Sequence, residues 1–227
     1  MAKTLALKPS EGTRNKLLWA AFAEFYKHGF QGGGLNQIVE AAGSTKGAIF
    51  HHFAGKQELG YAVLDEIIEP LLMERWLAPL VDTTDPIGDI KASFRQLVKE
   101  DIESGGWICG CPLNNLAQEM SPLDEGFRSR IDRLYTLLRS GFETALTDGM
   151  TAGTVRQDVN PPAVAAMLIA GQMGIWGSGK SSQSKVVMMQ ATDAMCDYLD
   201  SLKAQLRTEA TVMRRGREGL TATKVSG

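Results

Sequence analysis

The side chains best suited to contact a nucleic acid lie between residues 35 and 53, in the sequence LNQIVEAAGSTKGAIFHHF. The first part carries apolar residues at helical spacing, and Gly43 permits a left-handed turn before a second short helix. Ile49 and Phe53 face back onto the first helix. The outer side of the second helix carries Lys46, Phe50, His51 and His52. This pattern is typical of a DNA-reading helix-turn-helix, although an ordinary helical hairpin within a core has the same spacing.

The histidine pair His51-His52 could in principle bind a metal ion. Adjacent residues of a helix diverge by about 100°, and no further His or Cys lies nearby in the sequence. We therefore expect no metal, and nothing in the chain predicts another cofactor.

A second reactive group is the pair Cys109-x-Cys111. Two cysteines do not complete a zinc site, and the spacing lacks one residue of the Cys-x-x-Cys redox motif. A thiol switch that responds to oxidants or electrophiles is one reading, and inert packing of two free cysteines is the other.

Catalytic constellations are absent from the sequence. There is no phosphate-binding glycine loop, no Gly-x-Ser-x-Gly turn and no His-Glu-x-x-His helix. The run GSGKSS at 177–182 lacks a preceding strand and is interpreted as a flexible link between the last two helices. The chain is therefore predicted not to be an enzyme.

Motifs around the helix pair make the interpretation more specific. They are an amphipathic helix that ends in His28-Gly29-Phe30, the segment IVEAAG at 38–43, the stretch KGAIFHHF at 46–53, and GKQEL at 55–59. Together these motifs resemble the N-terminal domain of the TetR family of transcriptional regulators, over residues Thr13 to Asp65. The combination is more specific than a helix-turn-helix pattern alone.

The resemblance implies a domain that binds operator DNA as a homodimer, followed by a helical domain for dimerisation and effector binding. The position of each side chain on the second helix, and for His52 and Lys56 the resemblance, indicates which of them face DNA. Lys46 would reach a phosphate or guanine, Gly47 would let the backbone approach, and His52 and Lys56 would contact phosphates. Arg14 is expected to be solvated, with a contact to the DNA backbone as the alternative. The candidates for base edges are Thr45, Ala48, Phe50 and His51.

Two positions depart from the family pattern, and each lacks a hydroxyl. Gly33 stands where a Ser or Thr is usual, and a glycine cap donates nothing to a phosphate. Phe50 stands where tyrosine is favoured; its ring can touch a thymine methyl but cannot bond to a phosphate. We expect these changes to alter affinity and sequence preference without abolishing DNA binding.

Composition and charge agree with a two-domain regulator. The chain has 227 residues, 44% of them hydrophobic, and a net charge of −2 from 24 basic and 26 acidic residues. Residues 1–60 hold 7 of the basic and 4 of the acidic residues, which leaves 17 basic and 22 acidic residues for the remainder. The predicted DNA-binding end is therefore basic and the body is acidic. No long apolar run or secretory signal is present, and three cysteines do not form a disulfide framework, so no membrane association and a cytoplasmic location are expected.

The remaining sequence predicts an all-α protein. Three helix starts are signalled by a capping residue followed by proline, at Asp85-Pro86, Ser121-Pro122 and Asn160-Pro161. The first two are followed by amphipathic helices that end near Gly105 and Gly149. The third leads into an apolar stretch from 163 to 176. A last helix is expected from about Ser182 to Leu206. The predicted domains are a three-helix DNA-binding domain at 1–58, a larger helical effector-binding and dimerisation domain at 59–208, and a disordered tail at 209–227.

The last two helices are apolar over much of their circumference, so they need a covering partner. A four-helix interface between two copies would cover them, and a two-fold protein gains a second half-site on a pseudopalindromic operator; burial within the monomer is the alternative. The predicted interface residues are Ala163, Met167, Ala170, Gly171, Gly174, Val187, Met195, Tyr198, Leu199 and Leu202.

An apolar or aromatic small effector is expected to bind where Trp107 to Pro112 interrupts the helical pattern, although such side chains are often plain core. The predicted function is a ligand-responsive repressor released from its operator by that effector. The alternatives are a thiol-based regulator and a helical ligand-binding protein without DNA recognition. The predicted pocket residues are Trp107, Cys109, Cys111, Met120, Phe127, Met167, Met173 and Trp176.

Overall fold

A computed structural model describes residues 12–204, and within that range every regular element is a helix. The only β-type contact in the same range is a single antiparallel bridge between Val155 and Lys203. The predicted all-α fold is therefore confirmed. The predicted tail at 209–227 lies outside the described residues.

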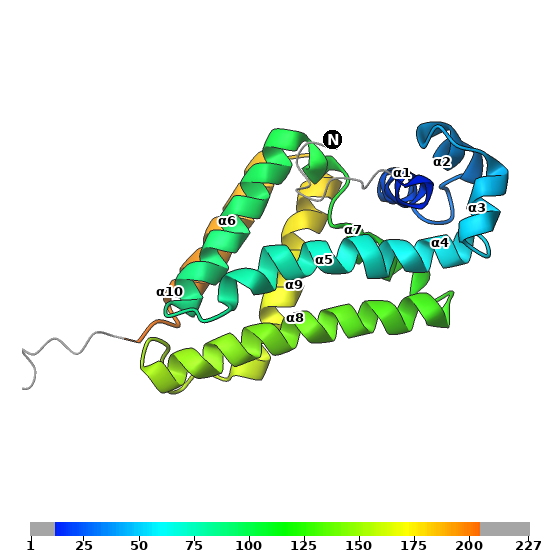
Figure 1. Ribbon diagram of the computed structural model, residues 1–227. Helices are drawn as coiled ribbons and strands as arrows, with labels where there is room; N and C mark the ends of the chain where they lie inside the picture. The colour runs from blue at the N-terminus through cyan, green and yellow to red at the C-terminus, as the bar shows by residue number, and fades with distance from the viewer. Residues whose placement is uncertain (1–11, 205–227) are drawn as a thin grey trace, which may run out of the picture.

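Three helices form the N-terminal end of the molecule (Figure 1). The first helix packs against both helices of the predicted helix-turn-helix and against the helix that follows them. Its buried face consists of Leu17, Leu18, Ala21, Phe22 and Phe25. The bounds of these helices are α1 Thr13–His28, α2 Leu35–Ala41 and α3 Lys46–His52.

A nearly continuous helical rod connects this end to the body of the molecule (Figure 1). Two of its turns are π-helical, and Pro70, which cannot donate a backbone hydrogen bond, lies between them. The N-terminal helices and the body are thus connected by one nearly continuous helix. Its consecutive parts are α4 Lys56–Val63, η1 Leu64–Ile68, α5 Glu69–Leu72, η2 Met73–Leu77 and η3 Ala78–Leu80.

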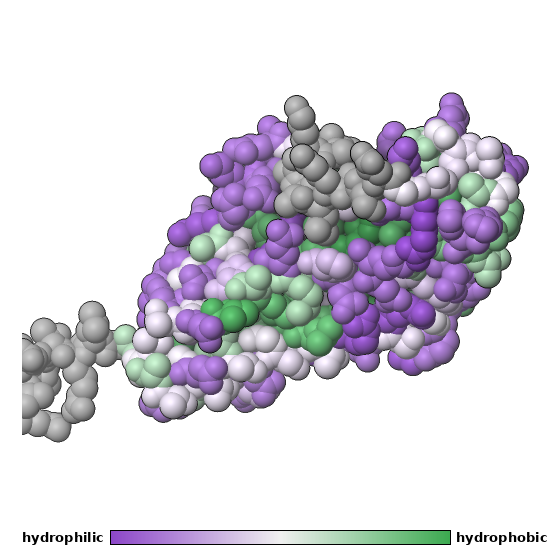
Figure 2. Space-filling view, viewed as in Figure 1, coloured by the Kyte–Doolittle hydropathy of each residue, from purple (hydrophilic) through white to green (hydrophobic). Residues whose placement is uncertain are grey.

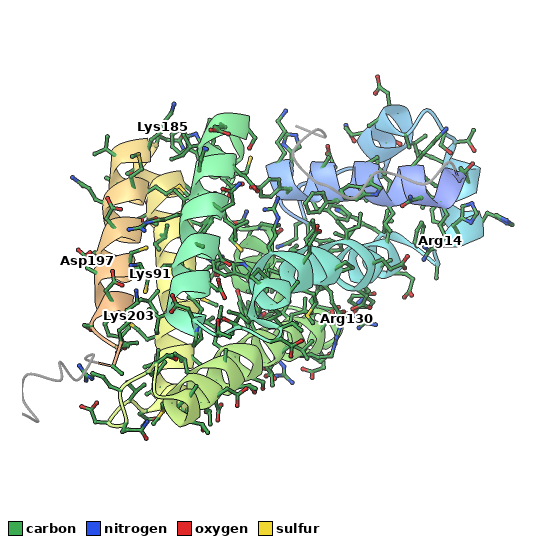
Figure 3. The ribbon with its side chains drawn as sticks, turned by 60° about the vertical axis from the view of Figure 1, so that its left-hand side comes forward. Arg14, Lys91, Arg130, Lys185, Asp197 and Lys203 are labelled. Atoms are coloured by element: carbon green, nitrogen blue, oxygen red, sulfur yellow. The ribbon has the colours of Figure 1, made fainter. Side chains whose placement is uncertain are left out.

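The body consists of longer helices that pack against this rod. α8 packs on α9, and α10 packs on both α6 and α9. Figure 3 shows Lys91 of α6 beside α10, where its Nζ forms an ion pair with Asp200. The bounds are α6 Pro86–Ser104, η4 Gly106–Ile108, α7 Pro112–Met120, α8 Glu125–Ala152, α9 Pro161–Ser182 and α10 Lys185–Asp200.

Two of the three proline-based start signals are confirmed. The side chains of Asp85 and Asn160 accept hydrogen bonds from Gly88 N and Ala163 N and cap α6 and α9. The prediction at Ser121-Pro122 is wrong, because α8 begins at Glu125 and is capped by Asp124, whose Oδ1 accepts from Phe127 N. α8 also continues past Gly149 to Ala152.

The interpretation of GSGKSS as a flexible link is also wrong. These residues form the last turns of α9, and the break follows at Gln183, which has a φ of +50°. Gly179 is buried against Met188 of α10, so close packing outweighs the low helix propensity of the glycines there. α10 accordingly begins at Lys185, after a cap by Ser184, and ends at Asp200 rather than Leu206.

Gly60 of α4 allows α4, Phe30 and α8 to approach closely. A Cβ at this position would lie 2.6 Å from Phe127 Cζ and 2.6 Å from Phe30 Cε2. We predict that Gly60→Ala lowers the free energy of unfolding by about 1–3 kcal/mol through overpacking, although alanine is the better helix former.

The matched control is Gly177→Ala in α9, where a Cβ meets nothing within 4 Å. This change should raise the free energy of unfolding by up to about 1 kcal/mol. Urea unfolding at a fixed protein concentration measures both. Equal stabilisation by the two substitutions would contradict the close approach at Gly60.

Candidate DNA-reading face and inter-domain cavity

The turn between α2 and α3 has the geometry that the sequence predicts. Gly43 adopts a φ of +57°, and Ser44 N donates to Val39 O to close the first helix. Thr45 then caps α3, because its hydroxyl accepts from Ala48 N at 3.3 Å. Ile49 is fully buried, which fixes the rotation of α3 about its axis.

The rotation of α3 leaves its opposite side open to solvent. Lys46, Gly47 and His51 are exposed, and 60% of Phe50 is accessible. A phenyl ring with this exposure has no partner within residues 12–204 to cover it. The face therefore offers a cation, an imidazole and an apolar ring to a binding partner.

The remaining predicted contact residues surround this face. Thr45 is exposed, while Ala48 and His52 are half-buried. Lys56 is partly buried: its Nζ donates to Gln31 O at 3.1 Å and lies 5.0 Å from the Phe30 ring centroid. Desolvation lowers the pKa of the Lys56 ammonium group, and the nearby Glu119 and Glu24 oppose that shift.

Arg14 is exposed, as expected, and its guanidinium also pairs with a carboxylate. Its Nη1 and Nη2 atoms lie 2.5 and 2.6 Å from the carboxylate oxygens of Glu66, and its guanidinium lies 5.0 Å from the Phe53 ring centroid (Figure 3). The ion pair therefore links α1 to η1. Because both side chains are over 40% exposed, the pair contributes at most about 1 kcal/mol.

Glu119 of α7 fixes the loop after α1 to the body. Its Oε2 accepts from Phe30 N at 2.8 Å and its Oε1 accepts from Gln31 N at 2.7 Å. On the far side of the same junction, Tyr61 of α4 donates to Asp124 Oδ1 at 2.6 Å. The DNA-reading end is thus attached to the body through polar contacts from both α7 and the start of α8.

A cavity of about 320 Å³ lies between α1 and the body. It is largely apolar, and its polar side chains include Arg75, Asp101 and Gln172. Apolar surface between α1 and the body is visible in Figure 2. The lining residues are Trp19, Phe22, Ala23, Tyr26, Lys27, Ile68, Leu71, Leu72, Arg75, Trp76, Leu97, Asp101, Ser104, Gly106, Cys109, Cys111, Pro112, Gln172 and Trp176.

Of the predicted pocket residues, the cavity includes Cys109, Cys111 and Trp176. Phe127 packs instead at the junction with the DNA-reading end, where its ring centroid lies 4.7 Å from that of Phe30. Met167 is 48% exposed on α9. The other three, Trp107, Met120 and Met173, lie outside the cavity lining.

Sequence reasoning missed the α1 wall and the polar side chains of this cavity. Trp19, Phe22 and Tyr26 recur at helical spacing on α1, which was a visible aromatic signal. Asp101 follows the apolar face of α6 and was a second signal, because a carboxylate beside such a face needs a partner. That partner is Trp176 of α9, whose Nε1 donates to Asp101 Oδ2.

The two neighbouring cysteines differ in exposure. Cys109 is partly exposed and Cys111 is buried. Burial raises the pKa of the Cys111 thiol, although hydrogen bonds from Asn114 N and Gln172 oppose the shift. Since the thiolate is the reactive form, Cys111 is poorly placed to react.

The predicted interface residues fall into three groups. Met195, Leu199 and Leu202 are buried within the chain itself. Tyr198 and Gly171 are partly buried. The others form an exposed surface on α9 and at the start of α10, consisting of Ala163, Met167, Ala170, Gly174 and Val187.

The fold and the α2–α3 geometry define a helix-turn-helix protein with a helical second domain. Residues 17–63 match the model described as "Bacterial regulatory proteins, tetR family", and residues 89–195 match "Tetracyclin repressor-like, C-terminal domain". The chain belongs to the TetR family of transcriptional regulators. Among residues 12–204, no helix is long and apolar enough to cross a membrane.

Individual relatives agree with this assignment. The transcriptional repressor DhaR of Mycobacterium sp. (strain GP1) is 26% identical over 152 residues, which cover 66% of this chain and 73% of DhaR. The regulator LmrA of Bacillus subtilis (strain 168) is 33% identical over 141 residues, 59% of this chain and 71% of LmrA. The reduced form of Escherichia coli NemR superposes with a TM-score of 0.75 at 25% identity, over 86% of this chain and 99% of NemR.

Glu119 provides a test of how the DNA-reading end is attached. We predict that Glu119→Ala speeds hydrogen exchange at the Phe30 and Gln31 amides, because both lose their acceptor. The control is Gln118→Ala, an exposed residue one position earlier on α7. Unchanged exchange at both amides in Glu119→Ala would show that Glu119 does not hold the loop.

Proposed function

We propose that this chain is a ligand-responsive repressor that binds a pseudopalindromic operator as a homodimer and is released by a small effector. The observation that carries the DNA-binding part is the open face of α3. A helix whose buried side is fixed by Ile49 and whose other side exposes Lys46, Phe50 and His51 suits the major groove.

On this proposal, different side chains of α3 would contact the phosphates and the bases of the operator. Lys46 and His52 would bind phosphates or guanine, and Phe50 would contact a thymine methyl. Thr45, Gly47, Ala48 and His51 lie close enough in sequence to reach base edges or the backbone. Lys56 already donates to Gln31 O, so its role would be to add positive charge near a phosphate while stabilising the loop.

The exposed apolar surface on α9 supports the homodimer. Met167 is 48% exposed, and small residues at 163, 170 and 174 let a second helix approach closely. Pairing of this surface with its copy would bury it and set the distance between two α3 helices. That distance must match half-sites one DNA turn, about 34 Å, apart.

Selection of bound fragments from random DNA, with the full-length protein at physiological salt, tests the DNA-binding proposal. We expect enrichment of a two-fold symmetric sequence. Lys46→Ala should then weaken binding and reduce the salt dependence by about one released counterion. The control is Lys99→Ala on α6, which removes the same charge from a side chain that is 67% exposed. Enrichment of no sequence over competitor DNA would refute the repressor proposal.

A separate measurement tests the cysteine-based alternative. Operator binding is measured before and after exposure to hydrogen peroxide in wild type, Cys109→Ser and Cys111→Ser. Because Cys111 is buried and its pKa is raised, we expect Cys111→Ser to respond as wild type does. A peroxide response that disappears in either variant would favour the thiol-based regulator over a response to a bound effector.

A further inference from the structure

The cavity between α1 and the body has features that specify its ligand more narrowly than apolar character alone. Its size, about 320 Å³, is near the lower end of small-molecule sites. Trp19, Trp76 and Trp176 come from three different segments of the chain. The rings of Trp76 and Trp176 lie 6.2 Å apart at an angle of 71°. Flat aromatic walls of this kind favour a compact aromatic ligand.

Asp101 supplies an open hydrogen-bond acceptor in this apolar setting. Its Oδ2 accepts from Trp176 Nε1, while Oδ1 accepts from no group between residues 12 and 204. Burial raises the pKa of the Asp101 carboxyl, and the residue as a whole is half-buried. A hydrogen-bond donor on a ligand in the cavity would bond to Oδ1.

The charges around the cavity favour neither an anion nor a cation. Arg75 and Lys27 line it together with Asp101, and Arg75 is paired with Glu100, so the four charges balance. Arg75 lies 3.6 Å from Glu100, and this ion pair partly neutralises its charge.

The DNA-reading domain itself forms one wall of the cavity. Trp19, Phe22, Ala23 and Tyr26 occupy one face of α1 at helical spacing. The Tyr26 hydroxyl lies 3.0 Å from Gly106 O and 2.6 Å from Gly110 O, so it donates to the loop that follows α6. A ligand here would therefore press directly on the helix that packs against α2 and α3.

We propose that this cavity binds an uncharged aromatic molecule with a single hydrogen-bond donor, which bonds to Asp101 while α1 covers its ring. This inference rests on the proposed function, because it names the effector class and the contact through which an effector acts. Ligand binding and operator binding are then coupled through α1, since a ligand shifts an equilibrium only by contacting its two states differently.

N-Phenyl-1-naphthylamine is a suitable fluorescent probe, because it is uncharged, aromatic and carries one N–H. We expect it to bind the full-length dimer with enhanced emission. Asp101→Leu should weaken its binding roughly tenfold, as for loss of a hydrogen bond to a charged group. N-Methyl-N-phenyl-1-naphthylamine lacks the donor and should bind wild type and Asp101→Leu about equally. Asp101→Asn, which keeps an acceptor for Trp176, serves if the leucine variant fails to fold.

A second pair of variants tests the α1 wall. Ala23→Trp places a large ring on the exposed, cavity-lining side of α1 and should weaken probe binding at least about tenfold by filling the space. Thr13→Trp, also exposed on α1 but outside the lining, should leave it unchanged. Absence of probe binding to wild type, or equal affinity in wild type, Asp101→Leu and Ala23→Trp, would overturn the assignment of the cavity.

Operator affinity of the same samples, with and without the probe, separates this inference from the proposed function. We expect the probe to weaken operator binding in wild type and not in Ala23→Trp. Probe binding that depends on Asp101 and Ala23 but leaves operator affinity unchanged would support the cavity and contradict release through α1. Failure to bind any operator would contradict the proposed function, while the fluorescence titrations would still decide the cavity.

Discussion

The packing of α1 constrains both halves of the molecule. One side of the helix is buried against α2, α3 and α4 through residues such as Leu17 and Ala21, both with no exposed area. The adjoining side carries Trp19 and Tyr26 and closes the cavity. Phe22 belongs to both surfaces, because it is buried in the core and also lines the cavity. Because α1 is shared in this way, it cannot move to change the shape of the cavity without also moving α2 and α3.

Polar contacts join α1 and the loop after it to the body, beside the packing of Phe30 on Phe127. Glu119 accepts two backbone N–H groups after α1, and Tyr26 donates to the loop after α6. Each hydrogen bond contributes on the order of 1 kcal/mol, or up to about 3 kcal/mol where a charge is involved. On the proposed function, a ligand that alters these contacts would shift the preferred orientation of α1.

Sequence patterns located the helix-turn-helix because its signals are local. Gly43 must adopt a positive φ, Thr45 caps the helix that follows, and Ile49 must be buried, all within a few residues. The start of α8 was misplaced for a related reason. Ser121-Pro122 and Asp124 are competing start signals, and Asp124 caps the helix and also receives the Tyr61 hydroxyl from another helix.

The cavity could not be found in the same way. Its walls come from α1, the helical rod, α6 and α9, and the approach of Tyr26 to Gly106 spans 80 residues of sequence. Aromatic spacing on α1 indicates a buried face but not what the face is buried against. Likewise, nothing local shows that Gly179 continues α9, since it packs against Met188 of α10.

Gly33 illustrates how tertiary packing explains a departure from a family pattern. A Cβ at this position would lie 2.7 Å from Phe25 Cδ1 and 3.0 Å from Gly29 O, so the fold leaves no room for the usual Ser or Thr. The start of α2 is instead secured from outside the motif, because Glu24 Oε1 accepts from Gly34 N at 3.1 Å. An acidic group in this position also favours the N-terminus of a helix electrostatically. The missing hydroxyl is therefore compensated structurally by α1, which secures the start of α2.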